Sequence, residues 1–292
     1  MISFILCSIK SQASETVCQN IRSTVGCEYE CIVIDNKTHP RSIAQVYNEG
    51  AHRAKGQVLC FVHEDVRFLT PDFGPAIEQK ALQPQTGVIG FLGTLYKAQA
   101  PSGWYIHNDL SVKHYIQSGH RGTEECVTNN LSSDGFTPVV IVDGCCMFVC
   151  RETWASYPFD TQLITGFHCY DVDFCLTLHH AGLINYVCSL SLMEHQSYGS
   201  YNIQWIETTL SLHREKWHGR LPMCAKDLTL TSQQQMAYEH HAWYDFLKKC
   251  VKSPLPLSQF LVLLKKARRV GFPHSKTFKL LYKLLFYRCL RK

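Results

Sequence analysis

The sequence lacks several features that would place it in common protein classes. No Cys-x-x-Cys pair occurs among its 15 cysteines, so nothing supports a zinc knuckle or a thioredoxin-type site. No uninterrupted apolar run approaches the roughly 18 residues that a membrane span needs. The first residues are apolar and lack a basic segment before Lys10, which is unlike a signal peptide. We therefore expect a cytoplasmic protein whose scattered cysteines are small core residues in a reducing compartment.

Acidic residues are absent from the last part of the chain. Residues 246–292 contain 13 Lys or Arg and no Asp or Glu, which leaves 16 of the 29 basic residues and all 24 acidic residues before them. The net charge is therefore −8 before residue 246 and +13 from there on, although it is +5 for the whole chain. This asymmetry says more about possible partners than the net charge of the whole chain does.

The first part of the chain alternates short apolar runs with amphipathic stretches. Val58–Val62 is long enough for a strand buried on both faces but too short for a buried helix. Strands are predicted over residues 2–9, 29–34 and 58–62, and helices over residues 42–54 and after a capping Ser14, the latter with Val17, Ile21 and Val25 on its inner face. Strands and helices in this order, with short connections, predict a parallel sheet with right-handed crossovers.

Four side chains that can bind metal or sugar stand at the carboxyl ends of these predicted strands. Asp35 ends the second strand, and His63, Glu64 and Asp65 directly follow the third. Ligands of open α/β sheets bind at this edge, so we expect one site there. Asp35 would accept a hydrogen bond from a base or a sugar hydroxyl, and Asp65 would offer an oxygen to a divalent cation. A turn residue is the equally supported alternative for Asp35.

The middle of the chain is less regular. Residues 87–93 are predicted to form a strand, and residues 96–137 have no clear periodicity, which is typical of a functional lid or a disordered insert. Residues 139–149 predict another strand, in which Gly144 marks a bulge or a place where a ligand approaches the backbone. A helix that ends at Ala181-Gly182 and a strand over residues 184–189 follow. Asp171 falls in the first turn of that helix, where the helix dipole favours a carboxylate.

Four segments, in this order along the chain, resemble the family 2 glycosyltransferases of the GT-A fold. They are Val33-Ile34-Asp35-Asn36, His63-Glu64-Asp65, Tyr170-Asp171-Val172-Asp173 and His195. They stand where the family has a nucleotide-binding acidic residue, an Asp-x-Asp signature, a Glu-Asp motif and a metal-binding histidine. His63 and Tyr170 replace the usual acidic residues, and Tyr47 stands where many relatives have an arginine. The likeness is strongest toward a bacterial subgroup with a His-x-Asp-Val signature.

The resemblance implies an α/β GT-A domain over residues 1–221, with a mostly parallel, Rossmann-like sheet and helices on both faces. A basic, mainly helical extension is expected over residues 222–292. The implied activity is that of a hexosyl- or N-acetylhexosaminyltransferase that moves a sugar, with inversion, from a nucleotide-diphosphate sugar to a hydroxyl. The acceptor would be a glycan or a lipid-linked precursor in envelope polysaccharide biosynthesis.

The resemblance also implies a role for each matching residue. Asp65 and His195 would bind Mn²⁺ or Mg²⁺, which neutralises a diphosphate leaving group as a Lewis acid. Asp171 would be the base that takes the acceptor proton, and Asp173 would anchor the helix start or a neighbouring backbone. The implied donor-binding residues are Asp35, Asn48, His63, Glu64, Asp65 and Gly144, and the implied acceptor-side residues are Cys145, His168 and Trp104.

Two alternative functions and several structural alternatives remain open. A catalytically inactive module could keep the fold to bind a nucleotide sugar or a glycan. A nucleotidyltransferase would need a glycine-rich loop after the first strand, whereas residues 7–12 contain no glycine. His195 and His168 could be structural histidines, and Trp104 with Tyr105 could close a loop instead of stacking on a sugar.

The basic tail is predicted to contain two short helices separated by Gly271-Phe272-Pro273. Each would have an apolar stripe and a basic remainder. One interpretation is a helical hairpin packed on the catalytic domain with a solvated basic face. The favoured interpretation is docking on an anionic membrane surface at the inner face of the cell membrane, close to a lipid-linked acceptor. Nothing in the tail resembles a base-reading module, so no nucleic acid is expected as a partner.

Overall fold

The computed structural model describes residues 1–118, 125–197 and 199–290 of the chain. The expected α/β architecture is confirmed. A seven-stranded sheet forms its centre, in the order β10-β13-β5-β12-β3-β1-β2. These strands are β1 (Ile2–Ser8), β2 (Tyr29–Asp35), β3 (Val58–Val62), β5 (Thr86–Gly90), β10 (Phe136–Val139), β12 (Cys146–Cys150) and β13 (Ile184–Cys188).

Helices cover both faces of this sheet, because its central strands are apolar on both sides. In β1, Ile5 packs into one hydrophobic cluster with α2 (Ile43–Arg53), whereas its neighbours Phe4 and Leu6 pack into the other with α1 (Ser11–Thr24) and α3 (Gly74–Ala81). Successive side chains of a strand point to opposite faces, so this division is expected for a sheet buried on both sides. The cysteines that the structure describes are free thiols, and Cys60 and Cys146 are core residues as predicted.

The two predicted helices of the first part are confirmed, but one predicted cap is wrong. Ser42 caps α2 in a capping box with Gln45, which satisfies the free amides of the first turn. Ser14 was expected to cap the first helix, yet α1 begins at Ser11, before it. Ser14 is instead buried inside α1, where its hydroxyl donates to the Ser8 hydroxyl at 2.7 Å.

The predicted mostly parallel sheet is in fact mixed. Strand β1 pairs in parallel with β2 and β3, and β13 pairs in parallel with β5. Strand β12 is antiparallel to both β3 and β5, and β10 is antiparallel to β13. The chain enters β12 directly from a loop at the carboxyl end of β3 and not through a crossover helix, which allows the antiparallel pairing.

A second, six-stranded sheet corrects two more expectations. It contains β4 (Val66–Phe68), β6 (Leu92–Thr94), β8 (Ser111–Gln117), β9 (Glu125–Asn129), β11 (Ile141–Val142) and β14 (Met193–His195). The runs predicted as single strands over residues 87–93 and 139–149 are each divided between the two sheets. The predicted lid over residues 96–137 contains the β8–β9 hairpin, β7 (Tyr96–Lys97) and a 3-10 turn over Asn108–Leu110, while residues 119–124 lie outside the described ones.

The C-terminal part is helical, as predicted. It follows α4 (Arg151–Ser156), α5 (Tyr170–His180), α6 (Ile203–Glu215) and a short strand β15 (Met223–Cys224) that pairs with β7. Its helices are α7 (Ser232–Lys252), α8 (Leu257–Arg269) and α9 (His274–Leu290).

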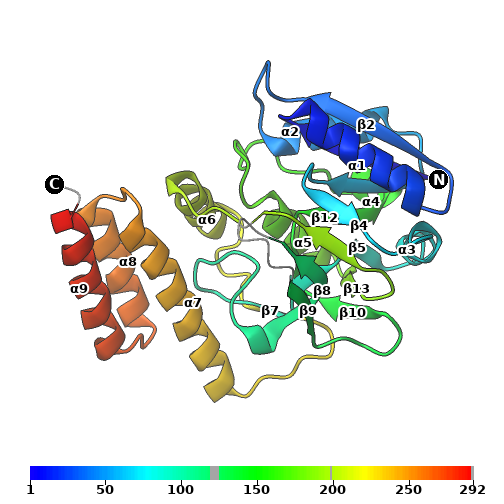
Figure 1. Ribbon diagram of the computed structural model, residues 1–292. Helices are drawn as coiled ribbons and strands as arrows, with labels where there is room; N and C mark the ends of the chain where they lie inside the picture. The colour runs from blue at the N-terminus through cyan, green and yellow to red at the C-terminus, as the bar shows by residue number, and fades with distance from the viewer. Residues whose placement is uncertain (119–124, 198, 291–292) are drawn as a thin grey trace.

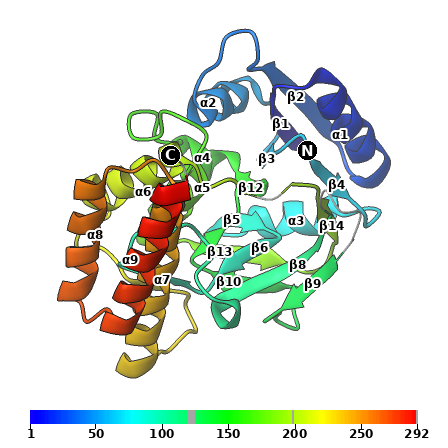
Figure 2. The same ribbon diagram turned by 60° about the vertical axis from the view of Figure 1, so that its left-hand side comes forward.

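These three helices lie side by side at one end of the molecule, and α1 and β2 lie at the other end (Figures 1 and 2). Gly271 separates α8 from α9 with a φ of +85°, a left-handed conformation that favours glycine. Among the helices of the described residues, none combines the length and the hydropathy of a membrane span.

Candidate active site

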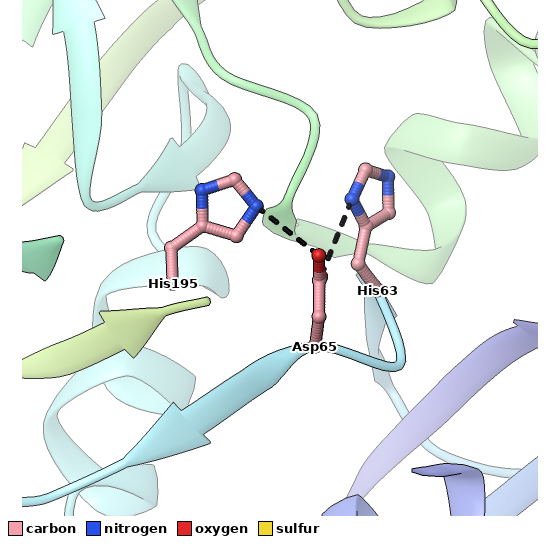
Figure 3. Close-up of side chains that lie close together, drawn as sticks. All are labelled: His63, Asp65 and His195. Atoms are coloured by element: carbon pink, nitrogen blue, oxygen red, sulfur yellow. Dashed lines mark ion pairs between the residues drawn. The ribbon is translucent and has the colours of Figure 1, made fainter. Parts of the chain in front are cut away.

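Three side chains that can ligate a metal meet where the two sheets adjoin. His63 and Asp65 lie between the end of β3 and the start of β4, and β14 pairs with β4 so that His195 lies opposite Val66. The two imidazoles flank the Asp65 carboxylate (Figure 3): His195 Nε2 lies 3.7 Å from Asp65 Oδ2, and His63 Nδ1 lies 3.9 Å from Asp65 Oδ1. One ligand atom from each residue lies within 4.8 Å of the others.

This triad fits a divalent cation. Asp65 Oδ1 is buried and has no hydrogen-bond partner among the described residues, although an unpaired buried carboxylate oxygen is costly. Two imidazole nitrogens and a carboxylate suit Mn²⁺ and related divalent ions. The structure therefore brings Asp65 and His195 together as expected for a metal site, and it adds His63, which the sequence suggested only as a donor contact.

Tyr170 orients the His63 ring for such a role. The Tyr170 hydroxyl donates to the Gly144 carbonyl at 2.8 Å and lies 2.6 Å from His63 Nε2. When this hydroxyl donates to the Gly144 carbonyl, it can only accept from His63, so the imidazole then donates from Nε2 and the lone pair of Nδ1 faces Asp65. Desolvation lowers the pKa of His63, and a neutral imidazole is the form that binds metal.

Two further carboxylates, those of Asp143 and Asp171, line the same cavity. Asp171 lies in the first turn of α5, and its Oδ2 accepts a hydrogen bond from the Gly144 amide at 3.3 Å. The pKa of Asp171 is raised to about 7, mainly by desolvation and to a smaller extent by repulsion from the Asp143 carboxylate. A side chain at position 144 is excluded, because its Cβ would lie 2.4 Å from the Tyr170 hydroxyl oxygen. Asp171 can therefore act as a base near neutral pH.

The cavity has a volume of about 290 Å³ and combines the metal triad, the two carboxylates and several aromatic rings. Trp104 and His168, both expected on the acceptor side, line it. Tyr201, Trp205 and Lys249 complete the wall, the last of them from α7. Segments far apart in the sequence therefore contribute to one site.

A model of the glycosyltransferase-like family matches residues 3–210 of the chain. The chain belongs to this glycosyltransferase-like family. The family match covers the strands and helices that position the triad and Asp171. No curated protein sequence matches the chain.

Two solved structures are similar to the chain at low identity. One is GalNAc-T7 with UDP, GalNAc and Mn²⁺, with 10% identity and a TM-score of 0.47 over 92% of this chain and 51% of the other. This chain thus spans about half of that structure's length. The other is the mannosyltransferase PcManGT from Pyrobaculum calidifontis with GDP-Man and Mn²⁺, with 11% identity and a TM-score of 0.48 over 99% of this chain and 86% of the other.

The resemblance implied acidic residues at positions 63 and 170, and the side chains of His63 and Tyr170 contact each other at 2.6 Å. The resemblance also implied an arginine at position 47; Tyr47 is buried in the core, where its ring packs 5.0 Å from that of Phe61 and 5.6 Å from that of Tyr170. Tyr47 therefore supports the rings behind the site and does not line the cavity.

Four residues predicted from the sequence do not line this cavity, and two of them fix the loops at the sheet edge. Glu64 Oε2 accepts from the amides of Ile9 and Lys10 at 3.2 and 3.1 Å, so it holds the loop between β1 and α1. Asp35 accepts from the Lys37 amide and the Thr38 hydroxyl, which is the turn role given above as the alternative.

The other two residues outside the cavity are structural anchors. Asn48 was expected near the donor, but its side chain bonds the backbone of Phe159 and the Trp154 indole. Cys145 was expected on the acceptor side, but it is buried in the core, and only its amide reaches the site, where it donates to Asp143 Oδ1 at 2.9 Å. Neither side chain is free to contact a ligand as it stands.

Asp173 has the anchoring role that the sequence suggested, although its partners are side chains. Its carboxylate is buried and accepts from Lys216 Nζ at 2.7 Å and from the Trp217 indole at 2.9 Å. It thereby ties the start of α5 to the end of α6. Asp143 was missed, because it lies inside the run over residues 139–149 that was predicted as one strand, where a single aspartate beside Gly144 has no local signal of a site.

Proposed function

We propose that this protein transfers a sugar from a nucleotide-diphosphate sugar to a hydroxyl of a glycan or of a lipid-linked acceptor, with inversion of the anomeric carbon. The observation that carries the proposal is that the His63–Asp65–His195 triad and Asp171 line one cavity of a glycosyltransferase-like protein. The sugar would be a hexose or an N-acetylhexosamine, for use in an envelope polysaccharide.

Each part of the site would have one task. His63, Asp65 and His195 would hold a divalent cation, Mn²⁺ or Mg²⁺, which when bound neutralises charge on the diphosphate leaving group. Asp171 would take the proton from the acceptor hydroxyl as it attacks, and its raised pKa suits a base near neutral pH. Tyr170 would hold His63 in the tautomer that presents Nδ1.

The most direct test is a panel of nucleotide sugars. The purified chain is incubated with each donor and Mn²⁺, first without an acceptor and then with glycan acceptors. One donor should be hydrolysed slowly and transferred faster when an acceptor is present. A chain that binds a donor but neither hydrolyses nor transfers it would instead be the inactive binding module.

We also propose that α9 docks on an anionic membrane surface, on the inner face of the cell membrane. The inner faces of α8 and α9 are packed as in the helical-hairpin interpretation, with Phe260 and Leu280 fully buried. The outer face of α9 is exposed and apolar, and it consists of Phe278 (69% exposed), Tyr282 (71%), Leu285 (66%) and Phe286 (55%).

Tyr282, Leu285 and Phe286 lie four, seven and eight residues after Phe278, which places all four on one stripe of α9. Lys279 beside them is exposed, and so are Lys265 and Lys266 on α8. Each Lys or Arg close to an anionic surface contributes on the order of 1 kcal/mol, and an apolar stripe can enter the interface. Docking through this face would bring the active site to a lipid-linked acceptor.

A further inference from the structure

Part of the cavity wall is built of aromatic rings that come from two separate segments. Trp104 and Tyr105 precede the 3-10 turn, with ring centroids 5.6 Å apart, and Tyr201 and Trp205 stand at the start of α6, with centroids 5.0 Å apart. Trp205 is 6% exposed, so its position is fixed by packing, whereas Tyr201 is 50% exposed and Tyr105 39%. The rings therefore continue from the cavity onto the open surface.

The C-terminal extension places an ion pair against these rings. Lys249 of α7 lines the cavity, with Nζ 4.2 Å from the Tyr201 ring centroid and 5.6 Å from that of Trp205. One helical turn earlier, Asp245 forms an ion pair with Lys249. Both residues lie beyond residue 210, where the family match ends. The site is thus completed by a part of the chain that the family pattern does not describe.

The chemistry of this wall suits a neutral sugar ring. Aromatic faces provide a flat apolar surface for the C–H face of a pyranose, and a few placed polar groups fix its orientation. The ammonium of Lys249, which lines the cavity, can donate to a sugar hydroxyl, and Asp245 holds that ammonium from behind. Because Asp245 compensates the charge of Lys249, an anionic ligand would gain less here than at an unpaired lysine.

We propose that Tyr201, Trp205 and the Lys249–Asp245 pair form a subsite for a neutral sugar ring of the acceptor. This inference rests on the proposed function, because it places the acceptor in the cavity that Asp171 lines. The cavity of about 290 Å³ is at the lower end of the range for ligand pockets, so a longer acceptor continues outward over Tyr201 and Tyr105. The acceptor is thereby a glycan and not a bare lipid or a polypeptide.

The test uses the full chain and a panel of neutral methyl glycosides of glucose, galactose, mannose and N-acetylglucosamine, with glucose 1-phosphate as an anionic counterpart. Binding is followed by saturation-transfer NMR and by tryptophan fluorescence. At least one neutral glycoside should bind, and it should bind better than glucose 1-phosphate. Tyr201→Ala should raise its Kd about three- to ten-fold, as expected for the loss of one aromatic contact.

Matched variants separate ring contact from general damage. Tyr201→Phe keeps the ring and should bind almost as the wild type does, and Tyr157→Ala removes an exposed tyrosine that does not line the cavity and should change nothing. Asp245→Asn leaves the charge of Lys249 uncompensated and should shift preference toward glucose 1-phosphate.

Three results would overturn the subsite: no binding by any neutral glycoside, tighter binding of glucose 1-phosphate to the wild type, or an equal effect of Tyr201→Ala and Tyr157→Ala. UDP and GDP binding with Mn²⁺ is measured in parallel. If a nucleotide binds with Mn²⁺ and the glycosides do not, the subsite alone is refuted. If no nucleotide binds with Mn²⁺, the proposed function itself is contradicted.

Discussion

The substitution Asp171→Asn tests the proposed base directly. An amide keeps the shape of the side chain, and its oxygen can still accept from the Gly144 amide, but it cannot take a proton. Sugar transfer should fall by about 10² to 10⁴, the usual contribution of a general base, which corresponds to about 3 to 5 kcal/mol of transition-state stabilisation. Donor affinity should change little, since Asp171 acts on the acceptor.

The pH dependence of sugar transfer is a second test of Asp171 as the base. The pKa of Asp171 is raised to about 7, so the wild-type rate should rise with pH and level off above neutrality as the carboxylate forms. The variant should lose this dependence.

The folding stability that Asp171 contributes changes with pH in the opposite direction to the transfer rate. A group with a raised folded-state pKa holds its proton more tightly in the folded state, so its stabilising contribution is present at low pH and is lost as pH rises through about 7. Asp171→Asn removes this loss and should be at least as stable as the wild type at pH 8.

The assay is transfer rate against pH, with thermal unfolding of each variant measured alongside. Asp109→Asn serves as the control, because Asp109 has a 68% exposed side chain that does not line the cavity. It should retain wild-type transfer. Near wild-type transfer by Asp171→Asn would refute the assignment of the base, whereas a large loss of stability at pH 8 would contradict the desolvation that explains the raised pKa.

Three further predictions concern the surroundings of the site and the tail. Asp143→Asn removes the carboxylate that raises the pKa of Asp171, so the rising limb of the pH–rate profile should move to lower pH; an unchanged limb would show that desolvation alone sets it. Tyr170→Phe removes the hydroxyl that fixes the tautomer of His63, so Mn²⁺ binding should weaken about 10- to 100-fold, as measured by electron paramagnetic resonance of free Mn²⁺. Mn²⁺ affinity equal to that of the wild type would refute the orienting role of Tyr170. The full chain should sediment with anionic and not with neutral vesicles, and Phe278→Ser with Tyr282→Ser should release it; continued sedimentation would leave the packed hairpin as the whole role of α9.

The first strands and helices could be predicted because the local signals there, apart from the Ser14 cap, agree with the tertiary structure. Val58–Val62 is buried on both faces, and Ser42 with Gln45 forms the capping box that begins α2. The second sheet could not be predicted in the same way. Several of its strands have two or three residues, such as Ile141–Val142 and Leu92–Thr94, which is too short for a periodicity to be recognised.

The candidate site was predictable where a residue directly follows a strand or begins a helix. Asp65 follows β3 and Asp171 begins α5, whereas His195 ends the short strand β14 and was expected only from the family resemblance; the structure brings all three to one cavity. Asp143 directly follows β11, which was not recognised as a strand of its own, and Lys249 reaches the cavity from a helix far along the chain. Asn48 is the opposite case, a residue that was expected in the site but lies outside it. It stands on a helix near the predicted site, yet its side chain bonds the backbone of Phe159.

We propose that His63, Asp65 and His195 hold a divalent cation that sugar transfer requires. The measurement that tests it is sugar transfer by the full chain during titration with a chelator, followed by re-addition of Mn²⁺, with Mn²⁺ binding counted by electron paramagnetic resonance in the wild type and in Asp65→Ala. We expect one bound Mn²⁺ per wild-type chain in the presence of donor. Transfer should cease in excess chelator and return with Mn²⁺, and the folded Asp65→Ala variant should show neither binding nor transfer. Undiminished transfer in excess chelator, or wild-type Mn²⁺ binding by Asp65→Ala, would contradict it.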